Sequence, residues 1–502
     1  MAQTLKLTPE QAADPRRLKG YRIIKKSIDA RGRQIWVNIT VEPTDGKAIR
    51  YENDYNYHDV SNKPSVVIVG AGPAGLFCAL RLIELGRKPI ILERGKEVLP
   101  RKQDIAALNR NTSLDTESNY CFGVGGAGTF SDGKLFTRSK KRGNNQRIVE
   151  IFHAHGAQDE ILYEAHPHIG TDRLPIVIKN MCDTIVNHGG EIHYSSRVDD
   201  IIIANGIAKG VRCSSGIEYL ANDVVLATGH SARDIYHMLE QKGISLEAKG
   251  FAIGVRAEHP QALIDKIQYH GQTTDYLPSA AYSLVSQVEG RGVYSFCMCP
   301  GGFIVPSATE GEQIVVNGMS SSQRNSPYAN SGIVVEIHPE DLPDEYKRYG
   351  SLCGLHFQQD VEHLAYVNNG GGLQTAPAQR LADFVRGEVS FDLPKSSYLP
   401  GLISSPLHFW LPEMIGKRLQ QGFREFDKRM HGYLTNEAVI VGVESRSSSP
   451  IRIPRNPDTL SHPEAKGLYP AGEGSGYAGG ITSSAIDGER IAEAIVAKSG
   501  FA

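Results

Sequence analysis

From Ser65 onward, short apolar runs alternate with segments of helical spacing. Val66 to Val69 is a β-branched run, typical of a strand buried in a parallel sheet. Residues 74–85 have helical spacing, and residues 89–93 form a second apolar run. Because strands that alternate with helices are the signature of a parallel sheet, we predict an α/β fold with a Rossmann-like sheet.

The same alternation returns on both sides of a less regular stretch. The pattern predicts helices at 174–188 and 482–498 and strands at 191–194, 200–203, 210–213 and 224–226. From about residue 249 to 433 the chain is rich in Gly, Ser and Tyr, which indicates an inserted, β-containing domain. We therefore predict one split domain of residues 61–250 and 434–502, interrupted by a domain of residues 251–433.

The first 60 residues form a separate unit in this pattern. Thr8-Pro9-Glu10 resembles a helix start, with Thr as the cap and Pro at the first helical position. Residues 21–29 and 34–42 read as two strands joined by a turn at Ala30-Arg31-Gly32. We predict a small N-terminal α+β domain of residues 1–60, with the polar segment 53–64 as its linker.

The charge balance excludes one class of partner. The chain of 502 residues has 54 Lys and Arg against 56 Asp and Glu, a net charge of −2. Binding to nucleic acid requires a clustered positive field, so we expect no nucleic-acid partner. Gly makes up 52 of the 502 residues, about one in ten, whereas its average usage in proteins is about 7%. This excess requires a local explanation.

The cysteine content and the lengths of the apolar runs indicate in which cellular compartment the protein resides. Seven cysteines scattered over a long chain are not a disulfide framework and suit a reducing compartment. Residues 1–19 are polar and lack the apolar core of a signal peptide. The longest weakly polar run, residues 66–80, is shorter than the about 20 residues of a membrane span. We expect a cytoplasmic protein with no membrane partner.

The stretch Gly70-Ala71-Gly72-Pro73-Ala74-Gly75 fits G-x-G-x-x-G between a strand and a helix, which is the context of a dinucleotide-binding turn. Gly70 makes the tight turn, Gly72 lets the backbone approach a pyrophosphate, and Gly75 permits close helix–strand packing. The helix N-terminus supplies N–H groups for the phosphates. Glu93 ends the next strand and is placed to accept hydrogen bonds from an adenosine ribose. A Gly-rich turn without ligand is the alternative.

Two other stretches match the same string, at residues 123–128 and 474–479. Neither follows an apolar strand, so neither predicts a second nucleotide fold. Gly-rich backbone allows close approach to a flat ligand, and we expect these loops to contact the rest of the same cofactor. Ordinary tight loops are the alternative.

Later segments resemble the signatures of the glutathione-reductase-type FAD flavoproteins. Val225-Leu226-Ala227-Thr228-Gly229 is similar to the Ala-Thr-Gly turn near FAD in those proteins, and Gly472-Glu473 occupies the position of their Gly-Asp pair. Gly480-Ile481 opens the last helix. The resemblance implies FAD. The candidate cofactor-binding residues are Gly70, Gly72, Pro73, Ala74, Gly75, Glu93, Arg94, Gly125, Gly126, Ala127, Gly128, Thr129, Val198, Thr228, Gly229, Gly472, Glu473, Gly480 and Ile481.

A closer resemblance is to the uncharacterised bacterial FAD-dependent dehydrogenases. It runs from about residue 20 to the C-terminus and rests on five stretches: residues 27–31, 125–135, 168–172, 296–302 and 444–446. Those proteins often have an acidic residue where this chain has Val124, so no role for that side chain is carried over. The family implies FAD and a redox fold but no substrate.

Candidate catalytic residues follow from what a flavin requires. Since the flavin carries the redox chemistry, the protein need only bind, orient and tune it. Asp132 and Lys134 lie beside a Gly-rich loop, where a cation would stabilise the negative charge of a reduced ring; a loop ion pair is the alternative. His168, with Asp172, is a candidate acid or base because His titrates near neutral pH. His166-Pro167-His168 lacks a distant ligand partner, so we expect no metal.

Two further residue pairs, one of cysteines and one of opposite charges, are weaker candidates for a role. Cys297 and Cys299 are spaced C-x-C, unlike the C-x-x-C of disulfide reductases, and buried structural thiols are favoured over a redox dithiol. Glu444 and Arg446 are expected to form an ion pair near a domain seam, with no role assigned.

The function expected on these grounds is an FAD-dependent oxidoreductase of unknown substrate, with NAD(P)H as a transient electron donor. No second nucleotide fold is visible, so a nicotinamide would bind at the flavin face. The alternative is a flavin-bearing adaptor, in which residues 1–60 bind a protein partner and FAD is mainly structural.

Overall fold

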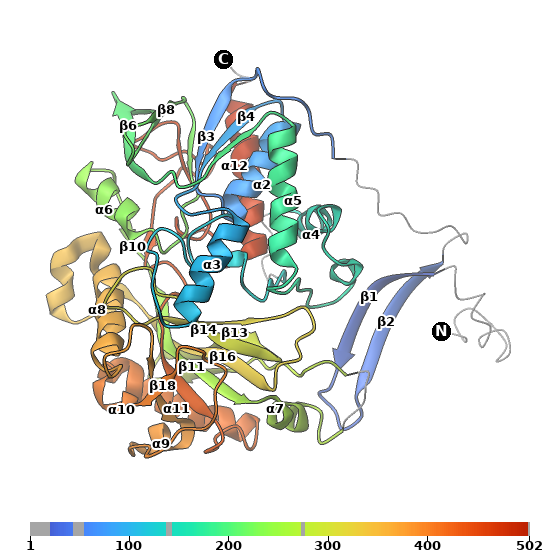
Figure 1. The fold of residues 1–502 in the computed structure, drawn as a ribbon, viewed down its shortest axis with the longest axis vertical. Coiled ribbons are helices and arrows are strands. Elements are labelled where there is room, and N and C mark those ends of the chain that lie inside the picture. The colour runs from blue at the N-terminus through green and yellow to red at the C-terminus, as the bar shows by residue number, and fades with distance from the viewer. Residues whose placement is uncertain (1–20, 44–54, 137–142, 273–276, 500–502) are drawn as a thin grey trace.

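A computed structural model describes residues 21–43, 55–136, 143–272 and 277–499 (Figure 1). The predicted helix start at Thr8 and the basic segment 139–142 lie outside these ranges. In this part of the chain, none of the helices is long and apolar enough to cross a membrane.

The first unit is built on a five-stranded parallel sheet in the order β21-β9-β3-β4-β5. Its strands, in that order, are Leu468–Pro470, Val224–Leu226, Ser65–Val69, Lys88–Leu92 and Glu191–His193. The outermost strand β21 returns from near the end of the chain, so the unit is split as predicted. The α/β, Rossmann-like fold is confirmed.

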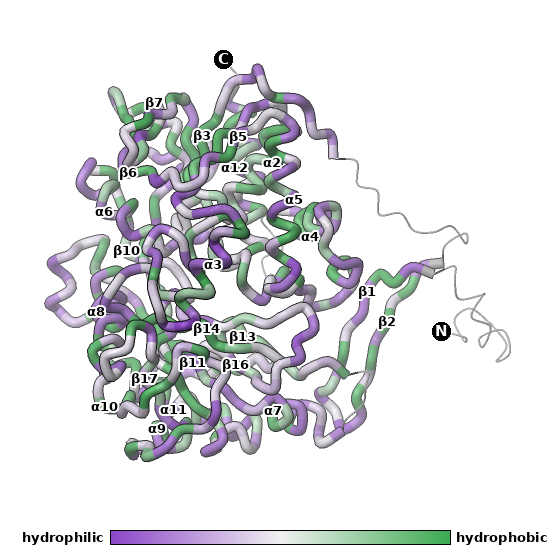
Figure 2. Tube along the Cα trace, viewed as in Figure 1, coloured by the Kyte–Doolittle hydropathy of each residue, from purple (hydrophilic) through white to green (hydrophobic). Residues whose placement is uncertain are grey.

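The two faces of this sheet are covered by different layers. Val66 and Ile68 of β3 pack in the core formed with the helices α2 (Pro73–Glu84), α5 (Leu174–Asn187) and α12 (Ile481–Ser499), which lie together in Figure 1. Val67 and Val69 point to the opposite face. Because successive strand residues alternate between faces, a run of apolar residues is required when both faces are buried. Figure 2 shows this hydrophobic character along β3 and α2.

The opposite face carries a three-stranded antiparallel sheet and α6 (Arg233–Gln241). The strands of this sheet are β6 (Val198–Ala204), β7 (Ile207–Cys213) and β8 (Glu218–Leu220). Helices α3 (Val98–Asn109) and α4 (Asn145–Ala154) and the 3-10 turns η2 (Gly126–Gly128) and η3 (Asp159–Leu162) complete the unit.

The second unit is built on a seven-stranded sheet in the order β12-β13-β16-β11-β19-β17-β18, antiparallel except for its last pair. Its strands, in that order, are Val285–Val288, Arg291–Cys299, Tyr328–Ile337, Phe251–Pro260, Val439–Glu444, Ala376–Arg380 and Leu402–Ser404. Strand β19 lies inside this sheet, between β11 and β17, so the predicted boundary after residue 433 is wrong. The sequence placed these residues in the cofactor unit because pairing between distant strands leaves no local signal.

Helices and small sheets surround the seven-stranded sheet. The helices are α7 (Gln261–Gln268), α8 (Cys353–Val367), α9 (Leu381–Arg386), α10 (Leu407–Trp410) and α11 (Glu413–Arg429), with 3-10 segments η4 (Pro339–Asp341) and η5 (Asp344–Leu352). Strands β14 (Gly302–Pro306) and β15 (Val316–Ser320) pair, as do β10 (Glu247–Ala248) and β20 (Ile451–Arg452). Phe423 and Phe426 of α11 are fully buried in the hydrophobic core of the second unit.

The N-terminal hairpin of β1 (Tyr21–Asp29) and β2 (Trp36–Pro43) lies beside both units (Figure 1). The Lys26 amide donates to the Tyr163 carbonyl at 2.7 Å, which ties the hairpin to the first unit. Gln272 Nε2 donates to the Arg33 carbonyl at 2.6 Å, which ties it to the second.

Candidate cofactor-binding and active site

A cavity of about 390 Å³ opens at the carboxyl ends of β3, β4, β9 and β21. In open α/β sheets this is the edge at which ligands bind. Of the predicted cofactor residues, the cavity wall includes Gly70, Gly72, Pro73, Ala74, Glu93, Arg94, Gly126, Ala127, Gly128, Val198, Thr228, Gly229, Gly472, Glu473, Gly480 and Ile481. Segments far apart in the sequence therefore meet in one site.

The turn from β3 into α2 is shaped for a phosphate. Gly70 has a φ of 103°, a value that glycine adopts without strain. Gly72 caps α2 without a side-chain hydrogen bond, and a Cβ placed on it would meet no atom within 4 Å because it faces the open cavity. The helix N-terminus therefore presents N–H groups and the positive end of its dipole to the cavity.

Gly75, in contrast, is not part of the cavity wall. A Cβ there would lie 2.0 Å from the carbonyl oxygen of Gly70. Its role is the close packing of α2 against the turn, as the third glycine of the motif predicts.

Glu93 cross-links the backbone around the cavity. Its Oε2 accepts from the Ala71 amide at 2.8 Å, and its Oε1 accepts from the amides of Gly95 and Gly123, each at 2.9 Å. The residue is 4% exposed. Since a carboxylate has about four acceptor positions, these three bonds leave one free on Oε2. A ribose bond is thus compatible with the geometry, but holding the loops is the role that the structure shows.

The Gly125–Thr129 stretch lies directly against the phosphate turn. The Gly125 amide donates to the Ala71 carbonyl at 2.7 Å, and a Cβ on Gly126 would lie 3.2 Å from the Cα of Gly72. Gly125 itself and Thr129 stay outside the cavity wall. The Thr129 hydroxyl donates to the Val124 carbonyl at 2.6 Å and so fixes the loop from behind.

Arg101 on α3 organises this loop, and sequence reasoning missed it. It is completely buried and donates to the carbonyls of Asn119, Tyr120, Val124 and Gly126 at 2.8–2.9 Å. Burial lowers the pKa of its guanidinium to about 10. A charged residue within a helical segment carries no local signal of such a role.

The C-terminal segments close the cavity from the side of α12. Thr228 and Gly229 follow β9, while Gly472 and Glu473 follow β21. Of the second Gly-rich stretch, 474–479, only Gly479 reaches the cavity; a Cβ on Gly474 would lie 2.4 Å from the Gly229 carbonyl oxygen. Most of that stretch is therefore tight packing, as the alternative interpretation held.

Among the candidate catalytic residues, Asp132 and Lys134 line the cavity and His168 does not. Lys134 Nζ lies 3.0 Å from Asp132 Oδ2, and Arg324 Nη2 donates to the same oxygen at 2.7 Å. Burial opposes the charge of Asp132, but the two cations overcome it and lower the pKa of its carboxyl.

His168 lies behind this cluster. Its Nε2 is 3.2 Å from the Ser322 carbonyl oxygen. Burial, with the positive charge of Arg324, lowers its pKa to about 4. The imidazole is therefore neutral near pH 7, and its placement does not favour the acid–base role predicted from sequence.

Cys297 and Cys299 lie close to Lys134, a relationship that sequence spacing did not reveal. Lys134 Nζ is 3.8 Å from Cys297 Sγ and 3.4 Å from Cys299 Sγ. Cys297 lines the cavity, whereas Cys299 is fully buried. The two thiols come from β13 of the second unit, so the site is completed by the contact between the two units.

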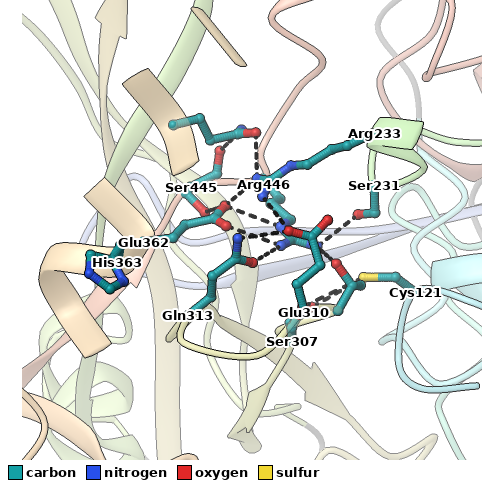
Figure 3. Close-up of polar contacts among 12 residues, drawn as sticks. Cys121, Ser231, Arg233, Ser307, Glu310, Gln313, Glu362, His363, Ser445 and Arg446 are labelled. Carbon is teal, nitrogen blue, oxygen red and sulfur yellow. Dashed lines mark hydrogen bonds and ion pairs between the residues drawn. The ribbon is translucent and has the colours of Figure 1, made fainter. Parts of the chain in front are cut away.

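A buried ionic cluster next to the cavity joins the units (Figure 3). Glu362 of α8 accepts from Arg233 at 2.8 Å and from Arg446 at 3.1 and 3.2 Å. Arg446 also donates to Thr309 at 2.7 Å and to Gln313 at 3.1 Å. Because the partner of Arg446 is Glu362, the expected Glu444–Arg446 pair is wrong.

Glu444 lies in the same region but has a different partner. It accepts from Arg256 Nη1 at 3.0 Å. Residues 444 and 446 are two positions apart, but β19 ends at Glu444, so the strand no longer fixes where Arg446 lies: Glu444 pairs with Arg256, and Arg446 pairs with Glu362.

No group of three or more His, Cys, Asp or Glu side chains suited to a metal ion occurs in the described ranges. The wall of the cavity instead fits FAD. It has a helix N-terminus without a side-chain cap for the pyrophosphate, glycine backbone open to the cavity at Gly72, and an acceptor position on Glu93.

Comparisons with known proteins agree with this fit. Residues 250–447 match the family described as "FAD-dependent protein, C-terminal domain-like", residues 65–99 match an FAD binding domain, and residues 10–43 match a domain of unknown function. Thiamine thiazole synthase of Aeropyrum pernix is 25% identical over 185 residues, which are 34% of this chain and 56% of that protein.

Among solved structures, L-proline dehydrogenase from P. horikoshii has a TM-score of 0.36 and 14% identity, over 87% of this chain and 94% of that one. An uncharacterised protein of Clostridium beijerinckii is 40% identical over 498 residues, which are 95% of this chain and 92% of that protein. The two FAD-related family matches support an FAD-dependent family and do not extend to the glutathione-reductase type. The chain belongs to the family of the Clostridium beijerinckii protein, a family of FAD-dependent flavoproteins.

Proposed function

We propose that the protein is an FAD-dependent oxidoreductase acting on a small molecule. The observation that carries the proposal is that one cavity joins a phosphate-binding helix N-terminus to a cluster of Lys134, Asp132 and Cys297 at its wall. Gly70 to Ala74 would hold the pyrophosphate, and Thr228, Gly472 and Ile481 would line the remainder of the cofactor. When bound, FAD supplies two-electron transfer.

Lys134 is proposed to tune that chemistry. Its ammonium is held at the cavity wall by Asp132, which with the nearby thiols outweighs burial and raises the pKa of the lysine. The lysine therefore stays charged at neutral pH and stabilises negative charge that develops in the cavity.

Glu473 is proposed as the proton-holding group in place of His168. It lines the cavity, and burial raises the pKa of its carboxyl to about 7. A group with a pKa near the working pH holds and releases a proton with equal ease, which general acid–base catalysis requires. His230 lies beside it, with its Nε2 3.9 Å from Glu473 Oε1.

A reduced nicotinamide is the proposed electron donor. The G-x-G-x-x-G turn between β3 and α2 is assigned to the pyrophosphate of FAD, so it is not free for a second nucleotide. A nicotinamide would therefore enter the same cavity and leave after hydride transfer. The comparisons lend no support to the adaptor alternative.

The test is identification of the cofactor followed by anaerobic reduction. The purified protein should be yellow, and chromatography of the chromophore released by denaturation should give FAD. NADH, NADPH and a panel of metabolites are then added without oxygen, and bleaching of the flavin identifies the donor. FMN in place of FAD, or a colourless protein that does not take up FAD, would contradict the proposal. FAD that no donor reduces would favour the adaptor.

A further inference from the structure

The backbone at Cys297 is held in an unusual conformation. Strand β13 pairs with β16 through Phe296 and Gly332 and again through Cys299 and Asn330, so one extra residue bulges out between these pairs. Cys297 occupies the bulge with a φ of 46°. For a residue with a side chain, such a conformation costs on the order of 1–3 kcal/mol and is characteristic of functional positions.

The bulge brings two sulfur atoms to one ammonium group. Lys134 Nζ is 3.8 Å from Cys297 Sγ and 3.4 Å from Cys299 Sγ. Arg256 Nη2 is 3.6 Å from Cys299 Sγ and donates to the Cys297 carbonyl at 2.6 Å. These cations stabilise a thiolate, the nucleophilic form of cysteine.

The groups around Cys297 and Cys299 give the two thiols different acidities. The Cys299 thiol donates to the Cys297 carbonyl at 3.3 Å. The interaction with the Cys299 thiol, aided by Lys134 and Arg256, lowers the pKa of Cys297. The pKa of Cys299 is raised by the same interaction. The acidic groups that face the pair are Asp132, Glu444 and Glu473; Asp132 is neutralised by Lys134 and Arg324, and Glu444 by Arg256.

Other cysteines of the chain lack this arrangement. Cys78 and Cys182 are buried thiols whose pKa is raised by burial, to about 12 for Cys182. Cys121 lines the same cavity, but its sulfur contacts the carbonyl and hydroxyl of Ser307. These contrasts favour a redox pair over the structural thiols that the spacing alone suggested.

We propose that Cys297 and Cys299 are a redox-active pair that takes electrons from the flavin and reduces a disulfide substrate. This inference rests on the proposed function. Cys297, at the cavity wall, is the attacking thiolate, and Cys299, behind it, is the resolving thiol. Lys134 keeps Cys297 ionised and stabilises the thiolate that forms again when the internal disulfide is broken.

The steps balance as ordinary thiol–disulfide exchange. The Cys297 thiolate attacks one sulfur of the substrate disulfide, and the other sulfur leaves as a thiolate that takes the proton of Cys299. Cys299 then attacks Cys297 Sγ, forming the internal disulfide and releasing the second substrate thiolate. FAD, when bound and reduced by a nicotinamide hydride, would supply the electron pair and the proton that break the internal disulfide. The products are the Cys297 thiolate and the Cys299 thiol.

The test counts thiols on the FAD-loaded protein with 5,5′-dithiobis(2-nitrobenzoic acid) as the disulfide probe. At substoichiometric reagent, each equivalent consumed should release two equivalents of thionitrobenzoate. The remaining thiols are alkylated at low pH, and peptide mass spectrometry should locate an internal disulfide at Cys297 and Cys299. In Cys299→Ser, one equivalent should be released and a mixed disulfide should remain on Cys297. Cys121→Ser is the matched control and should keep the wild-type stoichiometry and disulfide.

The stoichiometry separates the two proposals. A protein that carries no FAD contradicts the proposed function. The thionitrobenzoate released per equivalent of reagent still shows whether Cys297 and Cys299 form a redox pair. Conversely, a protein with full FAD content whose Cys297 stays unmodified, or holds a stable mixed disulfide in the wild type, overturns the redox pair alone. The wild-type result is sufficient if a variant does not fold. As a second readout, thiolate next to oxidised flavin should give a long-wavelength absorption band that disappears in Cys297→Ser.

Discussion

Glu362 and Arg446 form a two-point ion pair in the buried seam between the units, with Nε 3.2 Å from Oε1 and Nη2 3.1 Å from Oε2. Neither side chain is more than 4% exposed. Arg233 shares the carboxylate, so one buried negative charge serves two cations. Burial by itself would raise the pKa of Glu362, but the positive charges of Arg233 and Arg446 hold it at about 2.

Replacing Glu362 by Gln should therefore strongly destabilise the protein. Two buried arginines would lose their counter-charge, at a cost of about 3–5 kcal/mol. The free energy of unfolding from urea denaturation measures the loss. The control is Glu240→Gln on α6, which is exposed and should leave the urea midpoint nearly unchanged.

The same pair predicts an acid-dependent loss of stability. Because the folded-state pKa of Glu362 is about 2 and the ordinary value is about 4.3, its contribution is complete above pH 4.5. It is lost as the pH falls toward 2. Wild-type stability should decline in this window, and Glu362→Gln should decline less steeply. Equal slopes in both proteins would contradict the assignment.

Gly72→Val should remove FAD without preventing folding. A Cβ on Gly72 would meet no protein atom within 4 Å, and the added side chain would occupy the position where the pyrophosphate approaches the backbone. The ratio of flavin to protein after purification should fall at least tenfold. Gly86→Ala is the control: Gly86 follows the end of α2 with a φ of 74°, and alanine there costs roughly 1–2 kcal/mol but should leave the ratio intact. Equal flavin loss in both variants would show that this turn does not hold the phosphate.

Glu93→Gln should loosen the loops around the cavity. The carboxylate accepts from three backbone amides, and an amide NH₂ in place of either oxygen would face at least one N–H donor. An unsatisfied buried donor costs about 1–3 kcal/mol. We expect a lower thermal midpoint and weaker FAD binding together. A variant with normal stability but weak FAD binding would instead assign Glu93 to the ribose alone.

Glu473→Gln should change how the stability of the FAD-free protein varies with pH. The folded-state pKa of Glu473 is about 7, above the ordinary value, so folding favours its neutral form. The wild type then loses stability as the pH rises from about 4.5 to 7, by about 1.4 kcal/mol for each unit of raised pKa. Urea midpoints at pH 5.5 and 8 should show a smaller decline in the variant. A decline as steep as in the wild type would indicate an ordinary pKa.

Local sequence determined much of the cofactor unit. The apolar run of β3, the glycines of the turn and the spacing of α2 all act over a few residues, so strand, turn and helix could be predicted with bounds within one residue. Strand 224–226 and the hairpin strand 21–29 were predicted with the bounds that the structure has. The family resemblance added the Thr228, Gly472 and Ile481 segments, which line the same cavity.

Only the tertiary structure decided what surrounds that cofactor site. Strand β19 belongs to the second sheet because it pairs with β11 and β17, which are distant in the sequence. His168 is not part of the cavity wall, while Lys134 meets Cys297 although 163 positions separate them. Turns and helix starts depend on neighbours along the chain, whereas pKa values, ion pairs and the pairing of thiols depend on neighbours in space.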